Sequence, residues 1–201
     1  MALKIYGVAA SRTVRTLWMA EELGIEYEHV PVHFSGDAQQ PEFLARNPNG
    51  RVPVIDDDGL VVWESMAINL HLAETRGGPL APASAAERAG ALQWSFWVMT
   101  ECEKPLLNAY VNAIGLFGVE QDAEQVRQYM ARLERPLTVL DGWLAGRSWL
   151  IADRFTVADL NVAGVLMWIR DGRLDISAYG RLNAWLERCG ARPALERARS
   201  A

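Results

Sequence analysis

The first 77 residues alternate between short apolar runs and stretches in which apolar residues recur at helical spacing. Short apolar runs bounded by turn-forming residues are typical of strands. These runs are residues 3–6, 27–32, 52–55 and 60–63. Helical spacing predicts helices over residues 12–23 and from residue 65 to about 75. The predicted order is therefore β-α-β-(α)-β-β-α.

The connections between these strands predict how they pair. A helix joins the first two strands, which places them parallel in one sheet. Only the acidic turn at residues 56–59 separates the third strand from the fourth, so these two should form a hairpin. Residues 1–77 are thus predicted to form an α/β domain around a small mixed sheet.

Glycine and proline interrupt the pattern over residues 78–84, which predicts a linker. Beyond the linker the strand signals stop, and amphipathic helical stretches fill the rest of the chain. They cover residues 85 to about 114, 123–144, 157–168, 179–188 and 193–199. Residues 85–201 are therefore predicted to form an all-α helical bundle domain.

Two of these helices begin with a capping-box pattern. Ser84 and Thr156 are each followed three residues later by an acid, Glu87 and Asp159. In this spacing the hydroxyl accepts a hydrogen bond from the first helical turn, and the carboxylate bonds back to the capping residue. The pattern therefore predicts where these two helices begin.

The composition favours a globular protein and excludes several classes of partner. Half of the 201 residues are hydrophobic, 22% are charged, and the net charge is −5. This acidic balance lacks the basic excess that contacts with nucleic-acid phosphates require. No apolar stretch is long enough to span a bilayer or to act as a signal peptide. Cys102 and Cys189 are isolated in the sequence, which fits reduced thiols in the cytoplasm.

The reactive side chains form few familiar catalytic patterns. His29, His33 and His71 are not at metal-ligand spacing, so no metal site is predicted and none of them is given a role. Ser11 is more informative, because it stands where the first helix begins. Backbone N–H groups and the helix dipole make that position suitable for an anion or a thiolate. A serine there can equally be a plain helix cap.

Two further segments carry a resemblance to a known family. Residues 47–55 read Asn-Pro-Asn-Gly-Arg-Val-Pro-Val-Ile, and residues 63–72 include a Glu-Ser pair that opens a helix. Together with Ser11 and the predicted order of elements, these segments resemble the cytosolic glutathione transferases, and the match covers the whole chain. The resemblance implies a thioredoxin-like N-terminal domain followed by an all-helical domain. It also implies that the capping box at residues 156–159 is buried.

The resemblance places glutathione on the N-terminal domain. A cis peptide between Val52 and Pro53 would turn the backbone of Val52 outward, so that the cysteine of glutathione pairs with it like an added strand. Ser65 would bind the γ-glutamyl carboxylate, and Glu64 would face the γ-glutamyl amino group. By residue type alone, Ser65 is also a plain helix cap and Glu64 an exposed loop acid.

Gln39 and Arg51 resemble the polar residues that hold the glycyl end and the backbone of glutathione in this family. By residue type alone, both are also ordinary surface residues. Their assignment therefore depends on the neighbouring matches.

The nucleophile position bears on the subclass. Beta-type members carry a cysteine one place before Ser11, where this chain has Ala10, so the chain resembles serine-type, theta-like or phi-like bacterial members. Arg15 matches an arginine that follows the serine in such members. Tyr6 is the alternative to Ser11, because tyrosine-type members keep their catalytic hydroxyl at the end of the first strand. Ala38 stands where phi-type members have a histidine, so the class itself stays open.

The helical domain supplies the second-substrate pocket in this family. Trp94, Trp97 and Glu101 share one face of the first long helix. Trp94 is expected in the core, whereas Trp97 and Glu101 either belong to the same core stripe or reach the pocket. Glu103 points to a different face and is expected to be solvated.

The resemblance implies an enzyme, a glutathione transferase in which the bound thiolate of glutathione attacks a hydrophobic electrophile. Glutathione is then a co-substrate, and no other cofactor is expected. The alternative is a non-catalytic glutathione-binding or regulatory module on the same fold. The family also implies a homodimer, with the helix over residues 65–75 and the long helix after residue 84 at its interface. Neither nucleic acid nor a membrane is expected as a partner.

Overall fold

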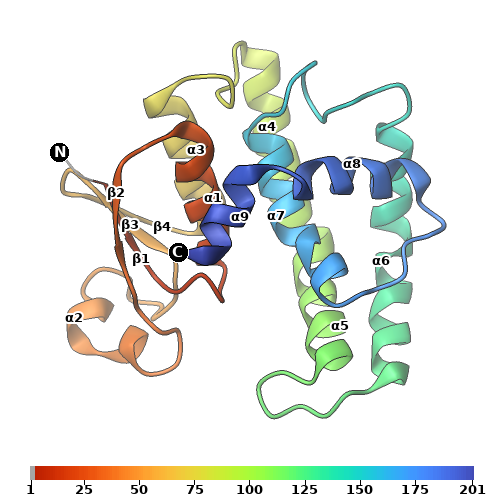
Figure 1. Cartoon of the computed structure of the whole chain (residues 1–201), viewed down its shortest axis with the longest axis horizontal. Coiled ribbons are helices and arrows are strands. Elements are labelled where there is room, and N and C mark those ends of the chain that lie inside the picture. The colour runs from red at the N-terminus through yellow and green to blue at the C-terminus, as the bar shows by residue number, and fades with distance from the viewer. Residues whose placement is uncertain (1–2) are drawn as a thin grey trace. The chain divides into compact units, whose positions relative to one another are not determined.

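The structure is a computed structural model that describes residues 3–201, and it divides into two compact units (Figure 1). One unit comprises Met1–Pro82 and Arg192–Ala201, and the other comprises Ala83–Ala191. The first unit is built on a four-stranded sheet, and the described elements of the second are helices. The predicted order of an α/β domain followed by an all-helical domain is confirmed.

The sheet has the strand order β2-β1-β3-β4. Its strands are β1 (Leu3–Tyr6), β2 (Tyr27–Val30), β3 (Val54–Asp57) and β4 (Leu60–Trp63). β1 is parallel to β2 and antiparallel to β3, and β3 forms a hairpin with β4 in which Ile55 pairs with Val62. Both the predicted parallel pair and the predicted hairpin are confirmed.

Helix α1 is central to the first unit. The helices of this unit are α1 (Thr13–Leu23), α2 (Pro41–Leu44), α3 (Ser65–Arg76) and α9 (Pro193–Ser200), with a 3₁₀ turn at Asp37–Gln39. α1 contacts β1, α3 and α9, and its Leu17, Trp18 and Met19 are fully buried. The chain leaves α1 through Gly24, whose φ of 63° is a left-handed conformation that glycine adopts without steric cost.

The C-terminal helix α9 groups with the first unit, whereas the sequence pattern places it with the helical domain. It packs along α1 (Figure 1). Arg192, just before α9, makes a bidentate ion pair with Glu22 at 2.6 and 2.7 Å, and Arg197 pairs with Glu21 at 2.6 Å. Amphipathic periodicity marks α9 as a packed helix but does not indicate which surface it covers.

Helix α7 forms the core of the second unit. The helices of this unit are α4 (Ala85–Trp97), α5 (Lys104–Ile114), α6 (Ala123–Trp143), α7 (Val157–Asp171) and α8 (Gly180–Gly190). α7 contacts α4, α5 and α8, and nearly every residue from Val157 to Ile169 is buried. A helix that is buried on all sides has mostly apolar residues along its whole length. The sequence of α7 shows this pattern. No helix within residues 3–201 is both long and apolar enough to cross a membrane.

The helix predicted from residue 85 to about 114 is interrupted. Val98–Glu103 forms a π-helical stretch between α4 and α5. A π-helix has more residues per turn than an α-helix, so residues in and beyond it rotate away from the face that a period of about 3.6 predicts. Glu103 is accordingly buried, with 7% of its surface exposed. The prediction that Glu103 is solvated is wrong because the helical period changes here.

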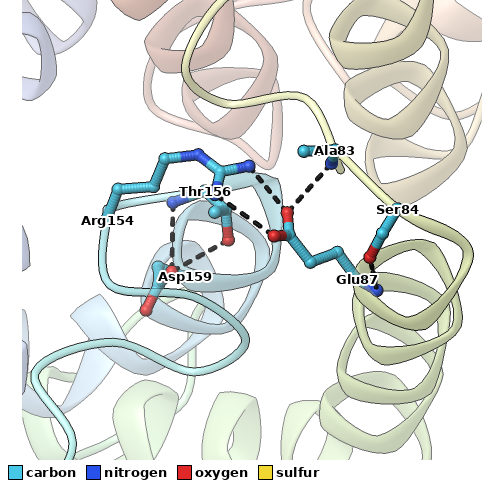
Figure 2. Close-up of polar contacts among 6 residues, drawn as sticks. All are labelled: Ala83, Ser84, Glu87, Arg154, Thr156 and Asp159. Carbon is cyan, nitrogen blue, oxygen red and sulfur yellow. Dashed lines mark hydrogen bonds and ion pairs between the residues drawn. The ribbon is translucent and has the colours of Figure 1, made fainter.

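Both helix starts predicted from the capping-box pattern are confirmed in the second unit (Figure 2). At α4, Ser84 Oγ accepts a hydrogen bond from Glu87 N at 3.1 Å. At α7, the Asp159 carboxylate accepts hydrogen bonds from the N–H and the hydroxyl of Thr156, both at 3.0 Å. Arg154 pairs with Glu87 at 2.6 Å and so joins the loop before α7 to the start of α4.

Candidate functional site

The turn between β1 and α1 is built around Gly7. Its N–H donates to Val30 O at 3.0 Å, and its carbonyl lies 2.7 Å from His29 Nε2, which must donate because a carbonyl can only accept. Gly7 has a φ of 136°, and a Cβ there would lie 2.0 Å from Thr13 Oγ1. Only glycine fits this position. β2 and α1 therefore fix the turn from two sides, and His29, which has no predicted role, supports it.

Ser11 lies just before α1 and is half-buried. Its Oγ accepts a hydrogen bond from Thr13 N at 3.1 Å, and it lies 2.7 Å from Val8 O and 2.9 Å from Thr13 Oγ1. Ser11 thus caps the first turn of α1, as one of its two interpretations predicts. This cap uses a lone pair of the oxygen, while the hydroxyl donates its proton to Val8 O and can turn from that carbonyl to another acceptor. Capping and donation to a bound group are therefore compatible at this residue.

Tyr6, the alternative to Ser11, is 8% exposed at the end of β1. Its ring meets Phe43 edge-on with centroids 6.5 Å apart, and the Arg46 guanidinium lies 5.0 Å from the ring centre. The buried cluster around it contains Val32, Ala38, Phe43, Val52 and Val54. Tyr6 is a packing residue of the first unit, and Ser11 is the less buried of the two.

The peptide bond between Val52 and Pro53 is cis, as predicted. Because β3 begins only after Pro53, the backbone of Val52 lies outside the register of the sheet. Asn47 holds the loop before it: this side chain is 2% exposed, its Nδ2 donates to Arg51 O at 2.7 Å, and its Oδ1 accepts from Asn49 N at 3.0 Å. The sequence reasoning missed Asn47, although an asparagine that opens a turn commonly bonds to the backbone just beyond it.

Gln39 and Arg51 lie at the same loop. Gln39 Nε2 donates to Gly50 O at 2.9 Å. Gly50 has a φ of 59°, and a Cβ there would lie 2.6 Å from Gln39 Nε2, so this glycine lets Gln39 approach the backbone. Gln39 and Arg51 are both exposed. The fold therefore brings these two polar residues beside Val52 and Pro53.

Glu64 and Ser65 form the start of α3. Glu64 is exposed and has a φ of 77°, which is uncommon for residues other than glycine, whereas Ser65 is only 4% exposed. The first helical hydrogen bond runs from Ile68 N to Glu64 O at 2.9 Å, so the preceding N–H groups of α3 have no acceptor within the helix. Among the described residues, no side chain caps α3 and no acid lies in its first turn. The start of α3 is therefore suited to an anion.

A buried arginine lies about one helical turn after Ser11. Arg15 is 1% exposed, and its carbonyl accepts a hydrogen bond from Asn69 Nδ2 of α3 at 3.3 Å. Asn69 is itself fully buried. The bond joins the two helices whose starts carry Ser11 and Ser65, and the guanidinium adds positive charge that favours a nearby anion.

In the second unit, Trp97 is half-buried and Glu101 is exposed. Trp97 meets Trp94 edge-on with ring centroids 4.9 Å apart, and Trp94, at 3% exposed, is a core residue as predicted. Burial raises the pKa of the neighbouring Cys102 thiol to about 12, so this thiol is not a nucleophile at neutral pH. Because neither side chain is fully buried, Trp97 and Glu101 have exposed surface that a ligand can reach.

Within residues 3–201, no cluster of three or more His, Cys, Asp or Glu side chains could hold a metal ion.

Comparisons with known proteins match both halves of the chain. The glutathione S-transferase N-terminal domain model matches residues 1–74, and the glutathione S-transferase C-terminal domain model matches residues 90–193. Among curated proteins, glutathione S-transferase 3 of Zea mays is 34% identical, and the alignment covers 97% of this chain and 92% of that protein.

Solved structures show the same similarity over both units. The theta class glutathione S-transferase from Xanthomonas axonopodis pv. citri, solved with glutathione bound, has a TM-score of 0.90 and 29% identity, covering 100% of this chain and 98% of that chain. The structure of glutathione S-transferase I bound with lactoylglutathione has a TM-score of 0.89 and 26% identity, covering 100% of this chain and 99% of that chain.

Proposed function

This chain belongs to the glutathione S-transferase family and is a glutathione transferase, and we propose that its Ser11 holds the thiolate of bound glutathione for attack on a hydrophobic electrophile. The observation that carries the proposal is the Ser11 hydroxyl at the start of α1. Its oxygen caps the helix, while its proton can turn to a ligand. Tyr6, packed against Phe43, is the less accessible alternative.

Thiolate formation is the chemical task of this site. A free cysteine thiol has a pKa of about 8.5, and lowering it by about two units requires roughly 2.7 kcal/mol of preferential thiolate stabilisation. A hydrogen bond from Ser11 to the charged sulfur, the start of α1 and the buried Arg15 can supply this together. The thiolate fraction at neutral pH then rises by at most about thirtyfold. Further rate must come from positioning the electrophile.

The other parts of glutathione bind along the first unit in this proposal. The start of α3 with Ser65 binds the γ-glutamyl carboxylate, and Glu64 faces the γ-glutamyl amino group. The backbone of Val52 pairs with the cysteine, and Gln39 and Arg51 bind the glycyl end. The left-handed backbone of Glu64 supports this assignment, because strained residues cluster where function requires them.

Trp97 and Glu101 are the proposed contacts to the electrophile, because both keep exposed surface in the second unit. The competing proposal is a glutathione-binding module without turnover, which would keep the same glutathione contacts. Retention on immobilised glutathione, followed by a conjugation assay with a generic aryl halide, separates the two. A chain that is retained but inactive would favour the module.

We also propose that the enzyme is a cytoplasmic homodimer. Each unit exposes large apolar side chains: Leu60 and Trp63 of β4 are 52% and 39% exposed, and Leu92 and Phe96 of α4 are 41% and 68% exposed. β4 is also an edge strand, which a second subunit can protect. Light scattering should give twice the mass of one chain. A strict monomer at micromolar concentration would contradict the dimer.

Ser11→Ala and Tyr6→Phe test the assignment of the thiolate. Ser11→Ala should leave glutathione affinity within a few fold but raise the pKa of the bound thiol by about one unit or more. Its kcat/KM at neutral pH should fall in step, while Tyr6→Phe should leave the pKa in place. The pKa is read from the ultraviolet absorbance of the bound thiolate during a pH titration.

The opposite result would assign the thiolate to Tyr6: an upward pKa shift in Tyr6→Phe with none in Ser11→Ala. A shift in neither variant would leave Ser11 as a helix cap only. Thermal melting of both variants provides the control for loss of structure.

A further inference from the structure

Thr13 carries a second hydroxyl beside Ser11 that the proposed mechanism does not yet use. It is the first residue of α1, is fully buried, and has its Oγ1 2.9 Å from Ser11 Oγ. Its N–H donates to the same oxygen at 3.1 Å. Thr13 thus contacts the Ser11 oxygen with both its backbone and its side chain.

The positions of the hydroxyl protons follow from counting donors and acceptors. Ser11 has one hydroxyl proton and two neighbouring acceptors, Val8 O at 2.7 Å and Thr13 Oγ1 at 2.9 Å. If Ser11 donates to Val8 O, the shorter contact, then the Thr13 hydroxyl can donate to Ser11 Oγ and both protons are used. In the reverse arrangement the buried Thr13 proton must find another acceptor, and a buried donor without one is costly.

We propose that Thr13 is a positioning residue for the Ser11 hydroxyl. Its N–H and its O–H both donate to Ser11 Oγ, which fixes the oxygen and confines its one proton to the side of Val8 O, where the thiolate of glutathione can share it. Hydrogen bonds in a chain strengthen one another by roughly 10–30% per bond, so the two donors make Ser11 a stronger donor to sulfur. This inference rests on the proposed role of Ser11.

Val8 allows Ser11 to redirect its proton at little cost. Val8 O also accepts a hydrogen bond from Ser11 N at 3.0 Å. When the Ser11 proton turns from Val8 O to the sulfur, this carbonyl keeps a donor and is not left unsatisfied. The lone pairs of Ser11 Oγ turn with its O–H bond, so both contacts from Thr13 persist only when the sulfur lies on the same side of the hydroxyl as Val8 O.

Gly7 is matched to the Thr13 hydroxyl. A Cβ on Gly7 would lie 2.0 Å from Thr13 Oγ1 and 3.0 Å from Thr13 Cβ. The turn before Ser11 therefore leaves space for this hydroxyl and for no larger side chain at position 7. The absence of a side chain at Gly7 is what permits Thr13 to reach Ser11.

Thr13→Val tests the inference, because valine keeps the branched shape and the N–H but removes the hydroxyl. We expect the pKa of the bound thiol to rise by about 0.5 unit and kcat/KM at neutral pH to fall about threefold. The control variant Thr13→Ser keeps a hydroxyl and should match the parent protein. In the Ser11→Ala background, Thr13→Val should cause no further pKa shift.

The outcomes separate this inference from the proposed function. If Ser11→Ala raises the thiol pKa and Thr13→Val does not, the role of Thr13 is overturned and that of Ser11 stands. If Ser11→Ala leaves the pKa in place, the role of Ser11 fails first, and that of Thr13 falls with it. A further shift from Thr13→Val in the Ser11→Ala background would also overturn the inference, since Thr13 would then act on sulfur without Ser11. Should thermal melting show that Thr13→Val is unfolded, Thr13→Ala takes its place with the same expected and contradicting results.

Discussion

Helices α3 and α7 both begin beside a hydroxyl residue, yet their starts are built in opposite ways. At α7, the Asp159 carboxylate accepts hydrogen bonds from the N–H and the hydroxyl of Thr156, from Leu150 N at 2.9 Å and from Trp185 Nε1 at 3.0 Å. At α3, no described side chain caps the helix, and Glu64 holds a left-handed backbone. A closed start uses up the donors that an anion would need. The first arrangement therefore stabilises the protein, and the second leaves donors for a ligand.

Removing the Asp159 carboxylate from the start of α7 should have the largest effect on stability. Asp159→Ala leaves buried donors without an acceptor, each at a cost of about 1–3 kcal/mol, so we expect the melting temperature to fall by about 10 °C. Burial raises the pKa of Asp159, and these donors act against that rise. Glutathione affinity per folded molecule should stay nearly unchanged in a titration. Asp153→Ala, at an exposed position of the same loop, is the control, and equal melting temperatures in the two variants would refute the closed start.

The closed start can be predicted from sequence, whereas the open one cannot. Thr156 and Asp159 have a local spacing with one physical meaning, and the acidic turn at residues 56–59 predicts the β3–β4 hairpin in the same local way. Glu64 looks like an ordinary loop acid, since its backbone conformation is not encoded by its residue type. The cis bond before Pro53 is a minority state, found for about 5–6% of X–Pro bonds. The family resemblance predicts the cis bond and gives Glu64 a role, but it does not predict the backbone conformation of Glu64.

The features that sequence reasoning missed depend on distant contacts or on a change of period. The pair of Arg192 with Glu22 holds α9 against α1, and no local pattern links residues so far apart in the chain. The π-helical stretch reverses the expected exposure of Glu103, because it changes the period without a change in composition. The contact of Thr13 with Ser11 depends on a turn whose shape only the folded backbone shows.

A change at the open start should weaken binding without loss of stability. Glu64→Gly removes the side chain that we propose faces the γ-glutamyl amino group, and we expect glutathione affinity to fall about tenfold. Glycine also relieves the left-handed backbone at φ 77°, so the free energy of unfolding should stay the same or rise by up to about 1 kcal/mol. Calorimetric titration and urea unfolding measure the two quantities. Asp58→Gly, at φ 59° in the hairpin turn, is the control for backbone relief, and equal affinity in both variants would remove Glu64 from the site.

The start of α4 has well-formed hydrogen bonds but a partly exposed ion pair. It therefore shows how much such bonds stabilise a helix start when they are not buried. Glu87 accepts hydrogen bonds from Ala83 N at 2.9 Å and from Arg154 at 2.6 Å, yet the two side chains of the ion pair stay 20% and 34% exposed. For a pair exposed to this degree we expect a coupling of about 0.5–1 kcal/mol. A double-mutant cycle with Glu87→Gln and Arg154→Met measures it. The same cycle at Glu124 and Arg127, a more exposed pair, should give a smaller value.

The change of the coupling free energy with pH shows whether the Glu87–Arg154 coupling comes from charge or from packing. The hydrogen bond from Arg154, and after it that from Ala83 N, lower the pKa of Glu87 in the folded chain. Its contribution is therefore complete above the ordinary glutamate pKa of about 4.3 and is lost as the pH falls through the lowered value. Urea unfolding at neutral pH and at a series of lower pH values should show the coupling shrink as Glu87 becomes protonated in the folded chain. A coupling that persists in acid would mean that the side chains act through packing rather than charge. The coupling free energy can also be compared with the loss of unfolding free energy in Asp159→Ala. If the two were equally large, the number of contacts at a helix start, and not their burial, would decide how much the start stabilises the protein.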